Sequence, residues 1–345
     1  MSRSRELWID SIKVFACILV AVGHFFQSMT NSHIISASAL TVWFNNTIYY
    51  FHVPLFFVCS GYLYQKYSHV ASVSSWKNNL VRKSITLGIP YFAFSIVTWL
   101  LKAVFSGSVN IENVGLVETL LFAPASPYWY LYILFFVFLV TPTFESRKMG
   151  MIVFAASVLL KLISVVVGEL PIYALSKLMA NEVWFVGGML LAQAKPQKNV
   201  LARWGLPVGC VLAAAFVVLS IWVYQITAAM PVIAFLMGIL GCVATVLIMS
   251  SVFSQERRYP VWEFMARYTM PVFLMHTIFA AGLRGVLLKL GVANGAVHIV
   301  VGLVISFVGP IVAAEIMGKV KFLDVFLNPG KYIKLGKKAL KQEIK

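Results

Sequence analysis

Residues 5–26, RELWIDSIKVFACILVAVGHFF, contain an apolar run that is typical of a membrane span, yet three ionisable side chains interrupt it. Asp10 and Lys13 stand near its start, and His24 stands near its end. Ionisable groups at membrane depth are costly, and they indicate function by default. At about 100° per residue, Lys13 and His24 fall within roughly 20° of each other, with Asp10 about 40° to the other side. The three side chains therefore form one polar seam, although a snorkelling lysine and a hydrogen-bonded histidine account for them equally well.

The composition places the whole chain in a membrane. Of its 345 residues 60% are hydrophobic and 12% are charged, and the mean hydropathy is +0.86. Soluble domains contain about 25% charged residues. The size suits one transmembrane domain, and the net charge of +16 suits basic cytoplasmic loops. The four cysteines lie in apolar stretches and show no disulfide or metal spacing, so we expect no metal site.

Apolar segments of about 20 residues predict the spans. The predicted fold is an all-α polytopic membrane protein with about ten transmembrane helices in one bundle. They lie near 8–28, 43–65, 84–105, 127–143, 149–167, 180–194, 205–225, 231–252, 268–288 and 297–318. The sixth is short, and residues 170–180 are either part of it or a re-entrant piece.

The basic residues orient this bundle. With the N-terminus inside, 22 of the 28 Lys and Arg fall in inner segments, and the outer loops near 29–42, 106–126 and 226–230 contain none. This asymmetry predicts that both termini are cytoplasmic. We expect a transmembrane domain over 1–318 and a basic cytoplasmic tail over 319–345 that lies on anionic lipid headgroups. No aromatic interleaving accompanies the basic tail, so a nucleic-acid partner is not expected.

His24 is the first candidate for chemistry. It stands roughly 24 Å into a span that starts inside, which places it in the outer part of the bilayer. A neutral imidazole there can take a proton from an attacking hydroxyl.

The second span contains FHVPLFFVCSGYL, residues 51–63. Pro54 and Gly61 indicate a kinked or broken helix that opens a cavity, to which His52 and Ser60 add polar groups. A packing kink, with Ser60 bonded to the previous turn, is the more common alternative.

Two further segments carry candidate binding residues. Arg82 and Lys83 lie at the expected inner mouth of the third span, where they can bind the phosphates of a cytoplasmic acyl donor or serve as ordinary positive-inside charge. Trp129 and Tyr130, in PYWYLY at 127–132, fit an interfacial aromatic belt, although aromatic rings also suit sugar faces.

The ninth span, YTMPVFLMHTIFAAGLR at 268–284, contains His276 and Arg284. Arg284 is the most anomalous charge in the chain, and it should face the bundle interior and pair with an anion, or reach the outer interface. Its expected depth resembles that of His24, so both can border one cavity. His276 is as readily a buried, hydrogen-bonded histidine as a functional one.

Together these motifs resemble membrane-bound acyltransferase family 3, the multi-span O-acyltransferases of bacterial polysaccharides and other glycans. WIDSIKVFACILVAVGH resembles the first-span motif, and FHVPLFFVCSGYL resembles the Pro…Ser-Gly-Tyr motif of the second. The basic run before IPY, WYLYILFFVFLVTP, FVGGMLL and PVFLMHTIF resemble later spans in the same order. Lys13 departs from the family's common Arg, and the third-span motif has Asn79, Arg82 and Lys83 where two Args three apart are common.

The resemblance implies transfer of an acyl group, usually acetyl, from cytoplasmic acetyl-CoA to a hydroxyl of a polysaccharide or other glycan at the outer side of a bacterial cell membrane. His24 would act as general base, or relay the acyl group as an acyl-imidazole, in a seam shared with Asp10 and Lys13. The expected donor-binding residues are Arg82, Lys83 and Ser60. The expected acceptor-binding residues are Arg284, His276, Trp129 and Tyr130.

Other classes of membrane protein fit some of these features. Intramembrane His and Arg, a kinked span and short loops also suit a transporter or flippase of a glycan or small solute. A sensory or scaffold protein would use none of these residues chemically. The sequence does not identify the acceptor, the length of the acyl group or the oligomeric state.

Overall fold

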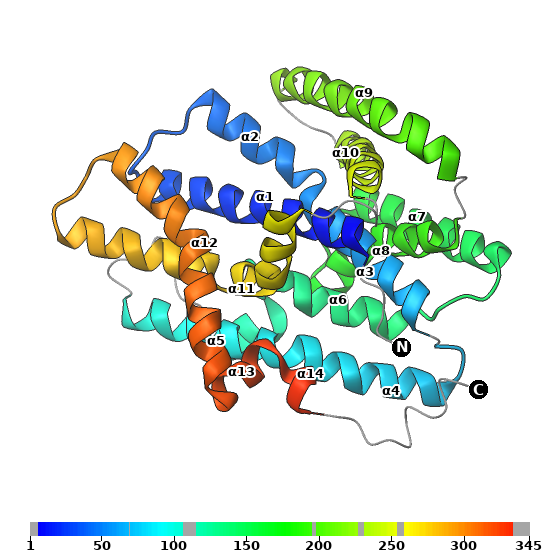
Figure 1. Cartoon of the computed structure of the whole chain (residues 1–345), viewed down its shortest axis with the longest axis horizontal. Helices are drawn as coiled ribbons and strands as arrows, with labels where there is room; N and C mark the ends of the chain where they lie inside the picture. The colour runs from blue at the N-terminus through cyan, green and yellow to red at the C-terminus, as the bar shows by residue number, and fades with distance from the viewer. Residues whose placement is uncertain are drawn as a thin grey trace.

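The computed structural model describes residues 6–68, 70–105, 115–194, 198–226, 231–253 and 259–333, and these form helices and no strand. The long helices pack as one bundle, with α9 and α10 at one side (Figure 1). The elements are α1 (Leu7–Asn31), α2 (Ala39–Tyr49), α3 (His52–Tyr67), α4 (Val73–Lys83), η1 (Ser84–Gly88), α5 (Ile89–Val104), η3 (Glu118–Phe122), α6 (Trp129–Val140), α7 (Arg147–Val167), α8 (Tyr173–Gln193), α9 (Lys198–Gln225), α10 (Pro231–Val252), α11 (Pro260–Lys289), α12 (Gly295–Lys319), α13 (Lys321–Leu327) and α14 (Pro329–Tyr332).

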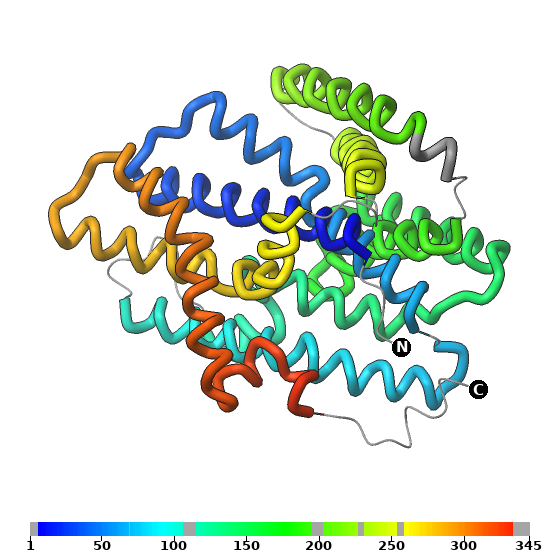
Figure 2. Tube along the Cα trace, viewed as in Figure 1, coloured from blue at the N-terminus to red at the C-terminus, as the bar shows by residue number. Residues whose placement is uncertain are grey.

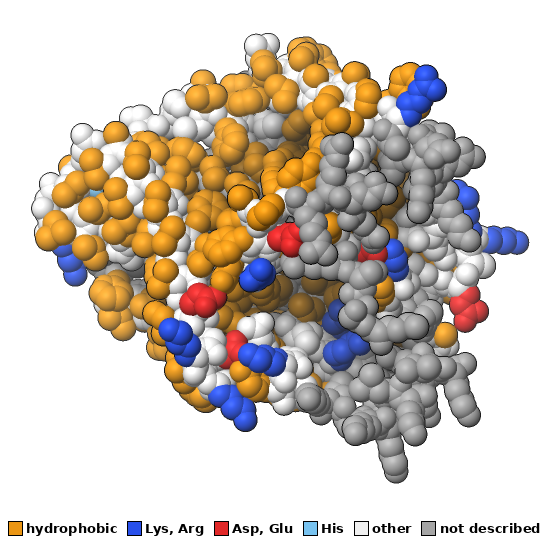
Figure 3. Space-filling model, in the orientation of Figure 1, with side chains coloured by type: hydrophobic (Ala, Val, Ile, Leu, Met, Phe, Trp, Pro, Cys, Tyr) orange, Lys and Arg blue, Asp and Glu red, His pale blue; other side chains and the backbone are white. Residues whose placement is uncertain are grey.

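Helices cover every predicted span, and among the described residues seven helical segments are long and apolar enough to cross a membrane by themselves. These are α1, the continuous α4–η1–α5 segment, α7, α9, α10, α11 and α12. Only 11% of the apolar window of α7 and 22% of that of α9 are buried, so their remaining faces require lipid. Hydrophobic side chains cover much of the face that α9, α11 and α12 present (Figure 3). The chain is a multi-pass membrane protein; the count of ten spans and the cytoplasmic side of the termini stay predictions.

The second predicted span is broken into two helices. α2 ends at Tyr49 and α3 begins at His52, so the break lies at Tyr50–Phe51, and α2 runs back along α1 (Figure 2). Pro54 lies in the first turn of α3, where its missing N–H costs no helical hydrogen bond. The prediction of a broken helix is therefore confirmed, but the prediction that Gly61 contributes to the bend is wrong, because α3 continues through it to Tyr67.

Gly61 instead allows α3 to cross α8 at backbone contact. A methyl group at Gly61 would overlap the carbonyl of Phe185, and one at Gly188 would overlap the carbonyl of Val58. The two pairs show that α3 and α8 run antiparallel. Such close crossings need residues without a side chain on both helices.

α1 and α11 run parallel, in a fixed register. The Cys17 thiol donates to the Thr269 carbonyl over 3.5 Å, and the ring of His24 lies beside that of His276 seven residues further along each helix. This register places the C-terminal half of α11 against the C-terminal half of α1.

The third predicted span begins earlier than its hydropathy indicates. α4, the π-helical turn η1 and α5 form one continuous 32-residue segment, Val73–Val104. The wide turn precedes Pro90, which cannot donate to the carbonyl four residues before it. Arg82 and Lys83 therefore lie inside this continuous helix, and their place at the inner mouth of the membrane span stays a prediction.

The predicted tail starts as a folded hairpin. α13 and α14 pack against α5 and η1, and Asp324 is 2% exposed and accepts hydrogen bonds from Asn328, Lys331 and Tyr332. Burial raises the pKa of the Asp324 carboxyl, but these three donors lower it by more, to about 2. Residues 321–332 thus extend the folded part of the chain beyond the predicted boundary at 318, and 334–345 lie outside the described residues.

Candidate active site

Two histidines meet between the C-terminal halves of α1 and α11. The rings of His24 on α1 and His276 on α11 are 5.5 Å apart between centroids and inclined by 31°. Parallel packing of the two helices brings them together, because each stands at the same level of its helix. The sequence predicted that Arg284 shares the depth of His24, but the structure pairs His24 with His276, and Arg284 lies beside Ser28, one turn further along α1.

His276 is held in one tautomer by its own helix. Its Nδ1 lies 2.9 Å from the Val272 carbonyl and 3.1 Å from the Phe273 carbonyl, so this nitrogen carries the hydrogen. Nε2 is then an acceptor, and it is buried without a partner in a side chain that is 1% exposed. A buried acceptor that lacks a donor costs about 1–3 kcal/mol, and such groups mark sites where a ligand can bind.

His24 has its own hydrogen-bond partner from a distant loop. Its Nε2 lies 3.2 Å from the hydroxyl of Ser126, and its ring lies 6.3 Å from that of Tyr49. Ser126 is exposed and His24 is half-buried. Nε2 of His24 therefore lies beside an exposed residue of the loop that precedes α6.

His52 is a third histidine near this pair, and from the sequence it was predicted only to add a polar group to a cavity. Its Nδ1 lies 2.5 Å from the Ile48 carbonyl, its ring is 4.8 Å from that of Tyr49, and it lies within electrostatic range of His24. The break between α2 and α3 brings it there as the first residue of α3. No set of three metal-ligating side chains occurs in the described part of the chain.

Arg284 lies about two turns beyond His276 on α11, where it contacts α1. Its guanidinium donates to the hydroxyl of Ser28 and, over 3.4 Å, to the Ser28 carbonyl. Ser28 is one turn beyond His24 on α1. Arg284 is half-buried, and among the described residues its contacts are a hydroxyl and a carbonyl and not the expected anion; the alternative that it reaches the outer interface stays open.

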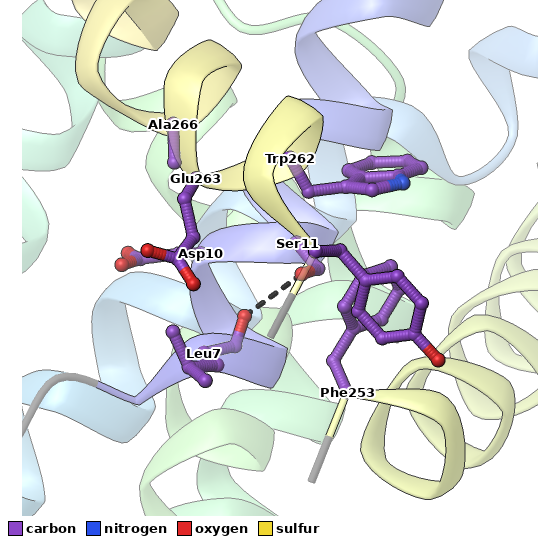
Figure 4. A pocket seen from close by; sticks show the side chains of 8 residues that line it. Leu7, Asp10, Ser11, Phe253, Trp262, Glu263 and Ala266 are labelled. Atoms are coloured by element: carbon purple, nitrogen blue, oxygen red, sulfur yellow. Dashed lines mark hydrogen bonds between the residues drawn. The ribbon is translucent and has the colours of Figure 1, made fainter. Parts of the chain in front are cut away.

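Asp10 and Lys13 lie at the other end of α1. Their charged atoms are 3.9 Å apart, as expected for neighbours three residues apart. Asp10 also lines a small pocket between α1 and α11, beside the carboxylate of Glu263 (Figure 4). Eleven residues of helix separate Lys13 from His24, about 16 Å. The structure therefore does not bring Asp10 or Lys13 into contact with His24.

Arg82 and Lys83 contact residues of other segments from the C-terminal end of α4. The Arg82 guanidinium donates to Asn79 Oδ1 over 3.2 Å and to the Ser68 hydroxyl over 3.4 Å. The Lys83 ammonium lies 3.7 Å from the centre of the Phe138 ring. Asn79 is 2% exposed, and its Nδ2 is buried without a partner. An amide donor without a partner, Asn79 Nδ2, therefore lies on the same helix as the two cations Arg82 and Lys83.

Ser60 and Tyr130 bond to each other across α3 and α6. Their oxygens are 3.0 Å apart, and the Tyr130 hydroxyl also donates to the Phe56 carbonyl over 3.2 Å. Tyr130 is 7% exposed, so the prediction of an interfacial aromatic belt is wrong for this residue; Trp129 is partly buried against the same core. The bond of Ser60 to Tyr130 also replaces the expected bond to the previous turn.

These features define a polytopic membrane protein with a polar, histidine-containing centre inside its helix bundle. A family model described as an acyltransferase domain matches residues 6–315, which includes every helix that carries the centre. The chain belongs to acyltransferase family 3, and it is a membrane acyltransferase. No curated protein and no solved structure matches it.

Proposed function

We propose that this acyltransferase moves an acyl group, acetyl in the first instance, from cytoplasmic acyl-CoA to a hydroxyl of a glycan at the outer side of the membrane. His24 is the general base. The observation that carries the proposal is the hydroxyl of Ser126 at 3.2 Å from His24 Nε2, because a base must lie within hydrogen-bond reach of the proton that it removes. A substrate hydroxyl at the same position can transfer its proton to the imidazole.

The proton passes from the acceptor to the leaving group through His24. Nε2 takes the proton from the attacking hydroxyl, the oxygen bonds to the thioester carbon, and the carbon–sulfur bond breaks. The CoA thiolate takes the proton from the imidazolium. His24 returns to its neutral form and is ready for another turnover.

His276 and Arg284 support binding of the acceptor. The unpaired Nε2 of His276 accepts a hydrogen bond from a second hydroxyl, a pattern that sugars provide. Arg284 lies about two turns further along α11, where its guanidinium can hold a sugar oxygen or the oxygen of the thioester carbonyl as charge develops on it. Both contacts would supply hydrogen-bond partners that the protein alone does not provide to His276 and Arg284.

The donor site lies at the C-terminal end of α4. Arg82 and Lys83 provide positive charge for the CoA phosphates, and the unpaired Nδ2 of Asn79 provides a further donor. The pocket beside Asp10 and Glu263 is a poorer place for phosphates, because its two carboxylates repel them. The acyl group and its thioester then extend toward His24.

The test is consumption of acetyl-CoA by the purified protein in nanodiscs, followed by release of free CoA. His24→Ala should lower the rate by about 100-fold or more, the usual contribution of a general base. His33→Asn is the matched control, because His33 has φ 56°, a conformation that Asn tolerates, and lies beyond the end of α1. Near-normal consumption in His24→Ala would overturn the assignment of the base.

Donor binding is tested separately. Arg82→Ala should weaken saturable binding of acetyl-CoA, while His24→Ala should leave it nearly unchanged, since the two residues act on different parts of the donor. Failure of acetyl-CoA and of longer acyl-CoAs to bind the wild-type protein would contradict the proposed donor.

A further inference from the structure

The contact between Ser126 and His24 joins two parts of the chain 102 residues apart. A serine hydroxyl within hydrogen-bond reach of a histidine nitrogen is the usual arrangement of a nucleophile and its base. Ser126 lies in the loop before α6 and is exposed, whereas His24 is half-buried. The hydroxyl therefore lies between the buried histidine pair and the surroundings of the protein.

The loop that carries Ser126 is anchored firmly. Tyr128, two residues further on, is 0% exposed, and its hydroxyl donates to the Leu274 carbonyl of α11 over 2.9 Å. The same hydroxyl lies 2.8 Å from the Thr98 hydroxyl of α5. α11 also carries His276, so the helix that positions this loop is the one that flanks His24. An anchored nucleophile loses little entropy when it reacts.

We propose that Ser126 is the nucleophile of a two-step transfer and carries the acyl group as a serine ester. This proposal rests on the proposed function, because it assigns the route of the same acyl group. In the first step His24 Nε2 takes the proton of the Ser126 hydroxyl, and Oγ attacks the thioester carbon. The carbon–sulfur bond breaks, and the CoA thiolate takes the proton from the imidazolium.

The second step repeats this chemistry with the acceptor. The acceptor hydroxyl gives its proton to His24 Nε2, and its oxygen attacks the ester carbon of acyl-Ser126. The bond between that carbon and Oγ breaks, and Oγ takes the proton back from the imidazolium. Because Ser126 is exposed, the ester is open to an acceptor that never contacts CoA.

A direct transfer would require a different arrangement. The acceptor hydroxyl would have to displace Ser126 from His24 before it could lose its proton. In the two-step route the hydroxyl that reacts with the donor is already bonded to the base. The thioester is then cleaved once per protein molecule even without an acceptor.

The experiment is to incubate the nanodisc protein with labelled acetyl-CoA and no acceptor, and to map the label by mass spectrometry of peptides. We expect one acetyl group as an ester on Ser126, which hydroxylamine or an added acceptor removes. Ser126→Ala should lose the label and about 100-fold or more of the turnover. Ser126→Cys should retain a labelled thioester, and Ser36→Ala, which alters another exposed serine, should behave as the wild type.

The outcomes separate this proposal from the proposed function. Label on His24, or unchanged turnover in Ser126→Ala, overturns the serine ester but leaves acyl transfer with His24 intact. No thioester cleavage by the wild type, with or without a glycan acceptor, overturns the proposed function itself. Tyr128→Phe provides a second variant with Ser126 present: it removes the anchoring hydroxyl, so the label should form more slowly at the same site.

Discussion

Two helix pairs in this protein are joined in opposite ways. α3 and α8 meet through their backbones, because Gly61 and Gly188 leave no room for even a methyl group. α1 and α11 meet through polar side chains, including two histidine rings 5.5 Å apart and an arginine on a serine. The α3–α8 contact is filled, whereas the α1–α11 contact keeps a buried acceptor without a donor, Nε2 of His276.

The difference separates framework from site. Close backbone crossings gain their stability from packing and fix the position of everything attached to them. An unpaired buried acceptor lowers stability, so its presence between α1 and α11 supports the proposed acceptor site there. Changes at the first pair should therefore destroy the fold, and changes at the second should destroy activity and leave the fold intact.

The largest expected effect on stability follows Gly188→Ala. The added methyl group would overlap the Val58 carbonyl, so α3 and α8 must separate, at a cost of about 3 kcal/mol. Thermal unfolding in detergent measures the loss. Gly187→Ala is the control, because a methyl group there meets only the Phe154 ring at 3.7 Å. Equal stability of the two variants would show that the crossing can open freely.

The second change is His276→Leu. It should lower acyl transfer about 100-fold, while the folded state is as stable as before or more so, because an unpaired acceptor is removed. His298→Leu should show the opposite pattern: His298 is also 1% exposed, but its Nε2 lies 2.8 Å from the Val292 carbonyl and closes a loop. Loss of stability with retained activity in His276→Leu would make His276 part of the framework.

A smaller effect is expected from Arg284→Gln. The variant keeps a donor for Ser28 and loses the charge, so KM for the acceptor should rise about tenfold, or about 1.4 kcal/mol, with little change in kcat. Steady-state kinetics with varied acceptor measure both constants. A fall in kcat with an unchanged KM would assign Arg284 to the transition state and not to acceptor binding.

The smallest effect concerns Glu6, which precedes α1 and links it to the C-terminal end of α3. Its carboxylate lies 2.5 Å from the Lys66 ammonium at the end of α3 and accepts from the Tyr67 hydroxyl over 2.7 Å. Because Lys66 is 38% exposed, Lys66→Met should cost less than about 1 kcal/mol at pH 7. The unfolding midpoint in denaturant measures this cost.

The pH dependence of this contact has a defined sign. Burial raises the pKa of Glu6, but hydrogen bonds from Lys66 and Tyr67 lower it by more, so the pKa lies below its ordinary value of 4.5. Its contribution to stability is therefore present above pH 4.5 and is lost as the pH falls through the lowered value. Lys66→Met should flatten this acid dependence; an unchanged acid profile would show that Lys66 does not stabilise the carboxylate.

Several features of the site could be predicted from single spans. The positions of His24 and Arg284 along their helices follow from counting residues, and both lie in the C-terminal halves of α1 and α11. Pro54 indicated an interruption near the start of α3. Gly61, by contrast, was assigned to a bend, since the sequence cannot show that another backbone lies against it.

Contacts between distant segments account for what the sequence did not predict. Ser126, in a loop, bonds to His24, and His52, at a break between two helices, lies within electrostatic range of it. Neither position has a local sequence pattern that predicts this proximity. Asp10 and Lys13 share a face with His24 along α1, but the rise of the helix keeps them at the other end.

The sequence by itself determined that this chain lies in a membrane as apolar helices, that it resembles acyltransferase family 3, and how far along each helix its ionisable residues stand. These properties depend on hydropathy, on motif order and on the fixed rise of a helix. Only the tertiary structure decided that α1 lies parallel to α11, that α3 crosses α8 at two glycines, and that Ser126 bonds to His24. Helix register and side-chain contacts depend on how whole surfaces pack, and packing is a property of pairs of segments that no single segment encodes.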